Sequence, residues 1–168
     1  REELLAHLKR PAILLMLSTL VLASGLFYIV IVYAPLHFKA AIGATPTDNG
    51  LILASRAIGA AIISAVGSSR LAMRVGTSNA IGIGFLLMAV MLITIPLLEP
   101  MQLILIAAVL FGIGYGIVMP NLYDALAALS PMGLRTSILA LGTGVSSLGQ
   151  FLSPVILGPL WKSAGIAV

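Results

Sequence analysis

Long apolar stretches, separated by short polar connections, make up most of this chain. Four of them contain no charged residue, and they cover residues 11–38, 75–98, 100–123 and 136–161. A fifth stretch, residues 49–69, is apolar except for Arg56. Each is long enough for an α-helix to cross about 30 Å of hydrocarbon, which takes roughly 20 residues. Since the stretches lack the alternating pattern of barrel strands, they predict an all-α membrane protein with several spans.

Proline and cap residues indicate where the predicted spans begin. Thr45, Pro46 and Asp48 combine a capping hydroxyl, a proline at the first helical position and an acid in the first turn. Ser130 followed by Pro131 repeats this pattern before the last complete span. We therefore expect spans at about 11–36, 46–68, 78–98, 101–126 and 132–157, with a sixth starting after 163. Residues 1–10 then form a cytoplasmic linker or an amphipathic segment on the membrane surface.

The composition agrees with a membrane protein and excludes several other classes. Of the 168 residues, 60% are hydrophobic and only 8% are charged, against roughly 25% charged residues in ordinary soluble domains. This excludes a soluble enzyme and a disordered chain. The nine Lys and Arg residues are too dispersed to follow a phosphate backbone, so we expect no nucleic-acid partner. With no cysteine, and with no companion at metal-ligand spacing for His7 or His37, we expect neither a metal nor a cofactor.

The positions of lysine and arginine predict the orientation of the spans, because cytoplasmic loops carry an excess of these residues. If residues 1–10 are cytoplasmic, the outer side holds only Lys39 and Lys162. The inner side then holds six basic residues: Arg1, Lys9, Arg10, Arg70, Arg74 and Arg135. The loops at 39–47 and 98–100 are therefore expected to face outward.

One inner loop carries a family motif. Residues 69–76 read Ser-Arg-Leu-Ala-Met-Arg-Val-Gly, which is similar to the cytoplasmic motif Gly-x-Leu-Ala-Asp-Arg-x-Gly of the major facilitator superfamily. The matching positions are Leu71, Ala72, Arg74 and Gly76. Ser69 stands in place of the first glycine and Met73 in place of the acid, and the second change removes the charge on which the motif's usual relay depends.

Three later segments extend the resemblance. Residues 112–120 resemble the glycine-rich tenth helix of that superfamily with its proline, and Ser130-Pro131 with Arg135 resembles the inner loop that comes next. The eleventh helix of multidrug and siderophore exporters is similar to the segment with Gly149-Gln150, Pro154 and Gly158-Pro159. From about residue 11 onward, the chain thus resembles the C-terminal six-helix half of the proton-coupled efflux branch, with its last helix truncated.

This resemblance implies a secondary active transporter that works by alternating access. Its substrate, a small amphipathic compound, would lie near the bilayer midplane between this half and an N-terminal half of the same protein. The partners implied are membrane lipid, the substrate and that N-terminal half, and the location implied is the plasma (inner) membrane. In such a fold the first, second, fourth and fifth spans line the cavity, and the third faces lipid.

Arg56 is the most specific candidate for the substrate cavity. At about 1.5 Å per residue it lies near the middle of its span, where an arginine costs about 2.5–3.5 kcal/mol on insertion scales. Its partner could be an acid on the other half, a tyrosine or carbonyl group, or an anionic part of the substrate. Alternatively, the long side chain reaches the outer interface. The other cavity candidates are Tyr28, Tyr115, Ser146 and Gln150.

A second group of residues suggests gating. Pro120 removes the hydrogen bond to the carbonyl of Gly116, so the fourth span is expected to kink there, either as a gate or passively. Gly112 and Gly116 have the spacing that lets two helix backbones approach in lipid, and we expect them to serve helix packing.

The inner ends of the spans hold further gating candidates. Asp124 could close an inner gate by pairing with Arg70, Arg74 or Arg135, or it could be a solvated helix end. By resemblance, Arg74 and Gly76 would hold the second and third spans together on the inside. Inner-side arginines are also what topology alone requires.

Two other functional classes compete with a transporter. A membrane enzyme needs paired carboxylates, a nucleophile with a base, or metal ligands within the bundle, and the predicted spans contain no acid at depth. An enzyme is therefore disfavoured. A non-catalytic membrane subunit, or a split half-transporter that needs a partner chain, fits the same sequence and stays open as the alternative.

Overall fold

The computed structural model describes residues 7–163, and every regular element within them is a helix, with no strand. The helices are α2 (Pro11–Ile42), α3 (Pro46–Val66), α4 (Ser68–Val75), α5 (Thr77–Thr94), the 3-10 turn η1 (Ile95–Leu97), α6 (Met101–Leu129) and α7 (Arg135–Ser163). Five segments are long and apolar enough to cross a membrane: α2, α3, α5 with η1, α6 and α7. The predicted all-α membrane bundle is therefore confirmed.

The helix ends differ from the expected spans in several places. The first helix continues past residue 36 to Ile42 and ends at Gly43, whose φ of 67° suits a residue without a side chain. The second span ends at Val66 rather than 68, and α4, which the sequence pattern did not predict, follows it directly. The fifth helix continues past 157 through Pro159 to Ser163. The sixth span expected after 163 lies outside the described residues.

The predicted caps have different outcomes. Thr45 and Asp48 form a complete capping box at the start of α3, with the Thr45 amide donating to Asp48 Oδ2 at 2.8 Å, so that prediction is confirmed. Ser130 does not begin the last span. Its hydroxyl donates to the carbonyl oxygen of Leu126 at 2.6 Å, which caps the end of α6, and α7 starts only at Arg135. The reason is that a serine can satisfy a free carbonyl at a helix end as well as a free amide at a helix start.

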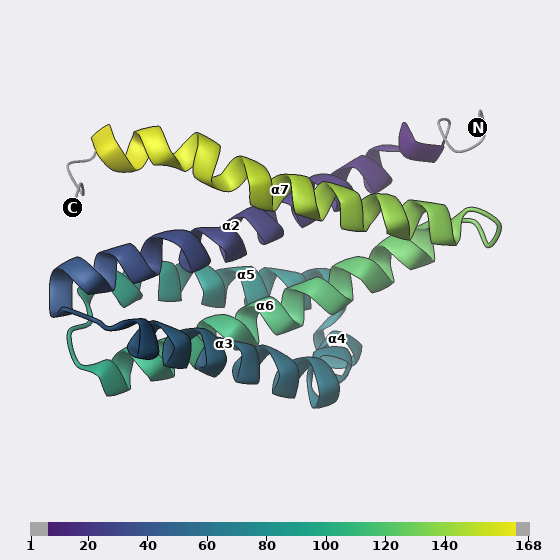
Figure 1. Ribbon diagram of the computed structural model, residues 1–168. Coiled ribbons are helices and arrows are strands. Elements are labelled where there is room, and N and C mark those ends of the chain that lie inside the picture. Colours follow the sequence, from purple (N-terminus) through teal and green to yellow (C-terminus); the bar gives the residue numbers. More distant parts are fainter. Residues whose placement is uncertain (1–6, 164–168) are drawn as a thin grey trace.

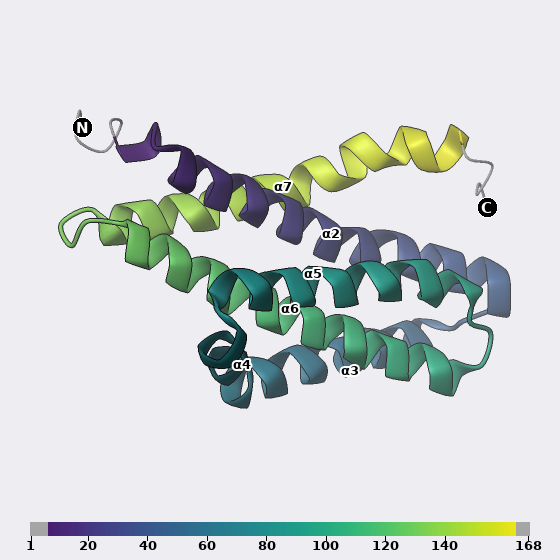
Figure 2. The same cartoon turned by 180° about the vertical axis from the view of Figure 1, so that it is seen from behind.

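The central helix of the bundle is α6, which packs against α3 on one side and α5 on the other. Figures 1 and 2, seen from opposite sides, show α6 between these two neighbours. The other close pair is α2 with α7, and α2 also contacts α6. The structure thus has a three-helix layer, α3–α6–α5, joined to a two-helix layer, α2–α7.

Glycines allow the helices within each layer to touch through their backbones. A Cβ atom on Gly112 would overlap the carbonyl oxygen of Arg56, and one on Gly116 would lie 2.5 Å from the carbonyl oxygen of Ala60. On the other side of α6, a Cβ on Gly114 would lie 2.8 Å from the carbonyl oxygen of Gly84 in α5. Close packing by small residues is the main means by which helices associate in lipid.

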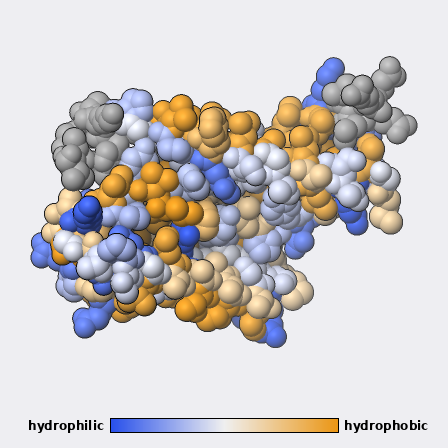
Figure 3. All heavy atoms as spheres, in the orientation of Figure 1, coloured by the Kyte–Doolittle hydropathy of each residue, from blue (hydrophilic) through white to orange (hydrophobic). Residues whose placement is uncertain are grey.

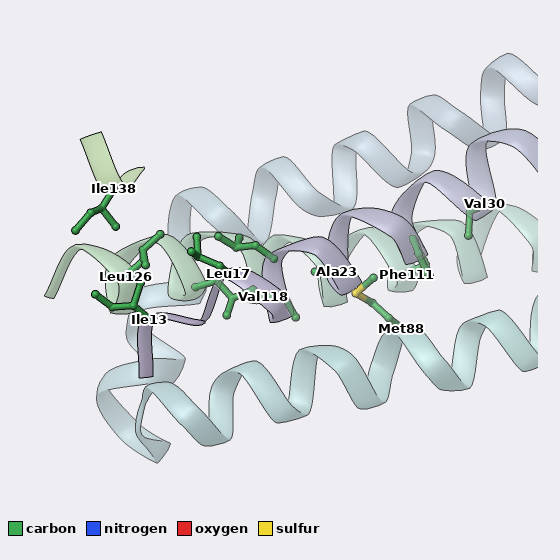
Figure 4. Packing of buried hydrophobic residues seen from close by; sticks show 11 residues of the cluster. Ile13, Leu17, Ala23, Val30, Met88, Phe111, Val118, Leu126 and Ile138 are labelled. Carbon is green, nitrogen blue, oxygen red and sulfur yellow. The ribbon is translucent and has the colours of Figure 1, made fainter. Parts of the chain in front are cut away.

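Side chains fill the space between the two layers. A buried cluster joins α2, α5, α6 and α7 (Figure 4). Its labelled members are Ile13, Leu17, Ala23, Val30, Met88, Phe111, Val118, Leu126 and Ile138. The contact between the layers is therefore made by flexible apolar side chains, unlike the backbone contacts within the three-helix layer.

The outer surface is apolar, as a lipid environment requires. On α5 the exposed side chains Ile83, Leu86, Val90 and Ile93 repeat every three or four residues and form one stripe. The buried residues of α5, among them Met88, lie on the opposite side of the helix, against α6. Orange atoms of hydrophobic residues also cover much of the face shown in Figure 3. A water-facing protein rarely exposes contiguous apolar patches of this kind.

Candidate functional site

Arg56 lies midway along α3 and is only 7% exposed. Its side chain does not reach toward the outer interface. The guanidinium carbon, Cζ, instead lies 4.0 Å from the ring centroid of Phe27 in α2. A cation at this distance over a ring face is attracted by the negative face of the aromatic quadrupole. The arginine thus connects the three-helix layer to the two-helix layer at the middle of the bundle.

Phe27 also stacks on Tyr115 of α6. The two ring centroids are 4.0 Å apart, and the ring planes differ by 21°. Phe27 and Tyr115 both lie near the midpoints of their helices. Three helices therefore bring Arg56, Phe27 and Tyr115 together at one depth, and we call these residues the mid-helix stack. The sequence analysis named Arg56 and Tyr115 but missed Phe27, although its depth in the first span, equal to that of Arg56, was a signal.

The polar atoms around this stack lack partners. Nε and Nη1 of Arg56 are buried and make no hydrogen bond within the described structure. The hydroxyl of Ser24, three residues before Phe27 and on the same side of α2, is also buried without a partner. A buried polar group without a hydrogen bond costs about 1–3 kcal/mol, and more when it is charged. Such groups in the interior of a bundle therefore indicate an acceptor that the described residues do not supply.

The carboxylates of the described residues do not fill this position. Asp48 is engaged at the start of α3, where its Oδ2 accepts from the Thr45 hydroxyl at 2.7 Å. Asp124 is exposed near the other end of the bundle, and Glu99 lies in the exposed connection before α6. Among residues 7–163, no acid lies within 4.0 Å of the Arg56 guanidinium. Among the described residues, the Arg56 guanidinium thus has the cation–π contact with Phe27 but no ion pair.

The remaining cavity candidates lie outside the mid-helix stack. Ser146 is buried in α7, and its Oγ lies 3.5 Å from the hydroxyl of Tyr123, a residue that the sequence analysis did not name. Tyr28 and Gln150 are half-buried, and within the described part of the chain neither makes a hydrogen bond or a ring contact. The structure therefore joins Tyr115 to Arg56 through Phe27. Tyr28, Ser146 and Gln150 make no contact of this kind with the guanidinium.

The proline in α6 is compensated by a neighbouring helix. Pro120 has no amide hydrogen, so the carbonyl of Gly116, four residues earlier, has no helical donor. The hydroxyl of Ser64 in α3 donates to this oxygen at 3.0 Å. The helix continues through Pro120 to Leu129. Position 116 is thus a glycine whose backbone touches α3 and whose carbonyl is also held by α3.

A buried amide holds the next turn of α6. Asn121 donates through Nδ2 to the Ser68 hydroxyl at 2.9 Å and to the Ile117 carbonyl at 2.7 Å. Ser68 in turn donates to Ile117 at 3.3 Å. We call Ser64, Ser68 and Asn121 the Pro120 clamp. The sequence analysis missed it, although a polar amide next to an intramembrane proline was a visible signal.

The inner-gate pairing offered for Asp124 is not formed in this structure. Asp124 lines a cavity of about 680 Å³ between α2, α5 and α6, together with Thr19, Thr77 and Ser78. No basic nitrogen in the described chain lies within 4.0 Å of its carboxylate. Arg135 instead donates through Nε to the Ala127 carbonyl at the end of α6.

The other two arginines offered for this pairing, Arg70 and Arg74, are exposed on the short helix α4. Gly76 forms the turn from α4 to α5 with a φ of 87°, a conformation that a side chain would strain. The backbone conformation therefore explains the glycine at this position of the loop motif, independently of any charge pairing.

Comparison with protein families agrees with the architecture. The model of the Major Facilitator Superfamily matches residues 15–167, which cover all of the last four membrane-spanning helices and the first one from residue 15 onward. A comparison with curated proteins gives no match. Members of the superfamily are transporters rather than enzymes. This chain, a multi-pass membrane protein with its polar groups in the centre of a helical bundle, belongs to the Major Facilitator Superfamily.

Proposed function

We propose that this protein is a secondary active transporter that exports small amphipathic compounds in exchange for protons by alternating access, in the plasma (inner) membrane. The observation that carries the proposal is the mid-helix stack, where a buried guanidinium with unpaired N–H groups lies beside two stacked rings. This combination of one charge and an apolar platform complements an amphipathic molecule.

We further propose that the chain forms the C-terminal half of the transporter and needs an N-terminal half to complete the cavity. The loop motif at residues 69–76 and the proline-containing α6 support this placement. Proton coupling would then use acids of the other half, because the described spans hold no acid at the depth of Arg56. Membrane lipid would cover the apolar stripe on α5.

Transport is tested with the full-length protein in liposomes that enclose a pH-sensitive dye. The added probes are fluorescent amphipaths of positive, neutral and negative charge. We expect at least one probe to cause proton movement that depends on the protein and stops when a protonophore collapses the gradient. The control is Gly82→Ala, an exposed position away from the stack where a Cβ meets nothing within 4 Å, and it should transport normally. If none of the probes causes proton movement that depends on the protein, proton-coupled export is contradicted.

The alternative, a non-catalytic subunit or a split half-transporter, is decided by the mass of the native polypeptide. A blot of native membranes against this region should give a product more than twice the 17.4 kDa of this chain. A product near 17.4 kDa would favour a partner chain instead.

A further inference from the structure

The mid-helix stack contains hydrogen-bond donors that have no acceptor within the described chain. Nε and Nη1 of Arg56 can only donate, and both lack an acceptor within the described chain. The hydroxyl of Ser24, which can donate as well as accept, is buried and unpartnered on the same side of α2 as Phe27. These donors come from two different helices. An acceptor with several lone pairs and a negative charge is the group that suits the two guanidinium donors.

The aromatic part of the stack restricts where such an acceptor can lie. The guanidinium carbon of Arg56 lies over the Phe27 ring, 4.0 Å from its centroid, and hydrogen bonds of a guanidinium lie in its plane. An oxyanion would therefore approach the edge of the guanidinium. The stacked rings of Phe27 and Tyr115, with centroids 4.0 Å apart, give an apolar surface beside that edge. A molecule with a carboxylate joined to an aromatic or apolar body would find a counterpart for each part.

We propose that the mid-helix stack is an oxyanion-recognition site, and that the transported substrate carries the oxyanion as a carboxylate or an equivalent group on an apolar body. This inference rests on the proposed transport function, and it narrows the substrate class from amphipathic compounds in general to amphipathic anions. The same chemistry could be supplied by a carboxylate elsewhere in the protein. Such an internal acid would satisfy Arg56 but would have no use for the apolar surface of Phe27 and Tyr115.

The test compares ligands that differ only in charge. Full-length protein in lipid nanodiscs is titrated with pairs of naphthalene, biphenyl and indole compounds, each as the carboxylate and as the primary amide. We expect at least one carboxylate to bind roughly tenfold or more tightly than its amide, which is the size of effect expected for charge-assisted hydrogen bonds. Arg56→Gln should reduce this ratio to about one, whereas Arg56→Lys should keep part of it.

Two further measurements separate the possible sources of the oxyanion. If an internal acid pairs with Arg56, no carboxylate in wild-type protein will bind better than its amide, and the proposal is overturned even where the liposome assay shows export. The comparison within wild-type protein does not depend on whether Arg56→Gln folds. A second variant, Phe27→Leu, should weaken carboxylates and amides alike while leaving their ratio above one. A ratio that falls to one in Phe27→Leu would also overturn the assignment, since the charge would then not act through Arg56.

Failure of this inference can be told apart from failure of the proposed function. Export of neutral or cationic probes, without a preference for carboxylates, would leave the transporter in place and remove the oxyanion site. Selective carboxylate binding without proton movement would support the site and contradict proton-coupled export.

Discussion

A single methyl group at position 116 should push α3 and α6 apart. A Cβ there would lie 2.5 Å from the carbonyl oxygen of Ala60, 2.5 Å from Cγ2 of Ile63 and 2.9 Å from Cα of Ala60. Since Cβ atoms essentially never approach other heavy atoms closer than 3.0 Å, the backbone of α3 must retreat by roughly 0.5 Å in Gly116→Ala. Two of the three contacts are with backbone, which cannot change rotamer to make room.

The size of the effect follows from two opposing terms. Overpacking of a well-packed contact costs about 1–3 kcal/mol, and replacing a helical glycine by alanine returns roughly 0.5–1 kcal/mol. We therefore expect Gly116→Ala to lose between about 0 and 2.5 kcal/mol of unfolding free energy, with about 1 kcal/mol near the centre of this range. The matched control is Gly82→Ala in α5, where an added Cβ meets nothing within 4 Å. This control should keep only the favourable term.

The assay is the thermal unfolding midpoint of the full-length protein in one lipid and at one heating rate, because unfolding of such proteins is commonly irreversible. We expect the midpoint of Gly82→Ala to lie at or above that of the wild type. The midpoint of Gly116→Ala should be lower, by about 2–4 °C for each kcal/mol of unfolding free energy lost. Gly112→Ala, where the overlap is with the carbonyl of Arg56 itself, should also lower carboxylate binding. Equal midpoints for Gly116→Ala and Gly82→Ala would refute the backbone contact between α3 and α6.

Three further predictions follow from the contacts described. Ser64→Ala leaves the Gly116 carbonyl without its donor, so the unfolding free energy should fall by about 1–3 kcal/mol; an unchanged midpoint would show that Pro120 needs no clamp. Phe27→Leu removes both the cation–π contact and the ring stack and should weaken probe binding several-fold, whereas Phe27→Tyr should restore it; equal affinities in titrations of both variants would contradict the stack. Asp124→Asn should change the midpoint by less than about 1 °C, because the carboxylate is exposed and unpaired; a large drop would reveal an ion pair that forms in another state.

The apolar pattern was sufficient to predict the helical bundle and the depth of Arg56. Both depend on local properties, namely the length of a charge-free stretch and the rise per residue of a helix. Helix ends were harder, because α2 passes through Pro35 and α7 through Pro159 without ending. A proline costs a helix one hydrogen bond, and packing against a neighbouring helix can offset that cost, as Ser64 does at Pro120.

The contents of the candidate site depended on contacts between helices. Phe27 and Arg56 are 29 positions apart, and their contact follows from how α2 and α3 are each placed against α6. No period within a single span encodes that placement. The short helix α4 was not predicted for another reason, since a polar eight-residue segment has no membrane-spanning pattern.

The two kinds of packing described above also determine which parts of the bundle can slide. Where glycine brings carbonyl groups of α3 and α5 against α6, backbone meets backbone and resists relative displacement, so we expect these three helices to move as one rigid unit. The boundary with α2 and α7 is filled by flexible apolar side chains, and it is the natural shear plane. Phe27 crosses that plane to lie against Arg56 and Tyr115. A molecule that displaces this ring would therefore shift the two layers relative to each other. Distances between spin labels on α2 and α6 should then change, while distances between labels on α3 and α5 stay constant.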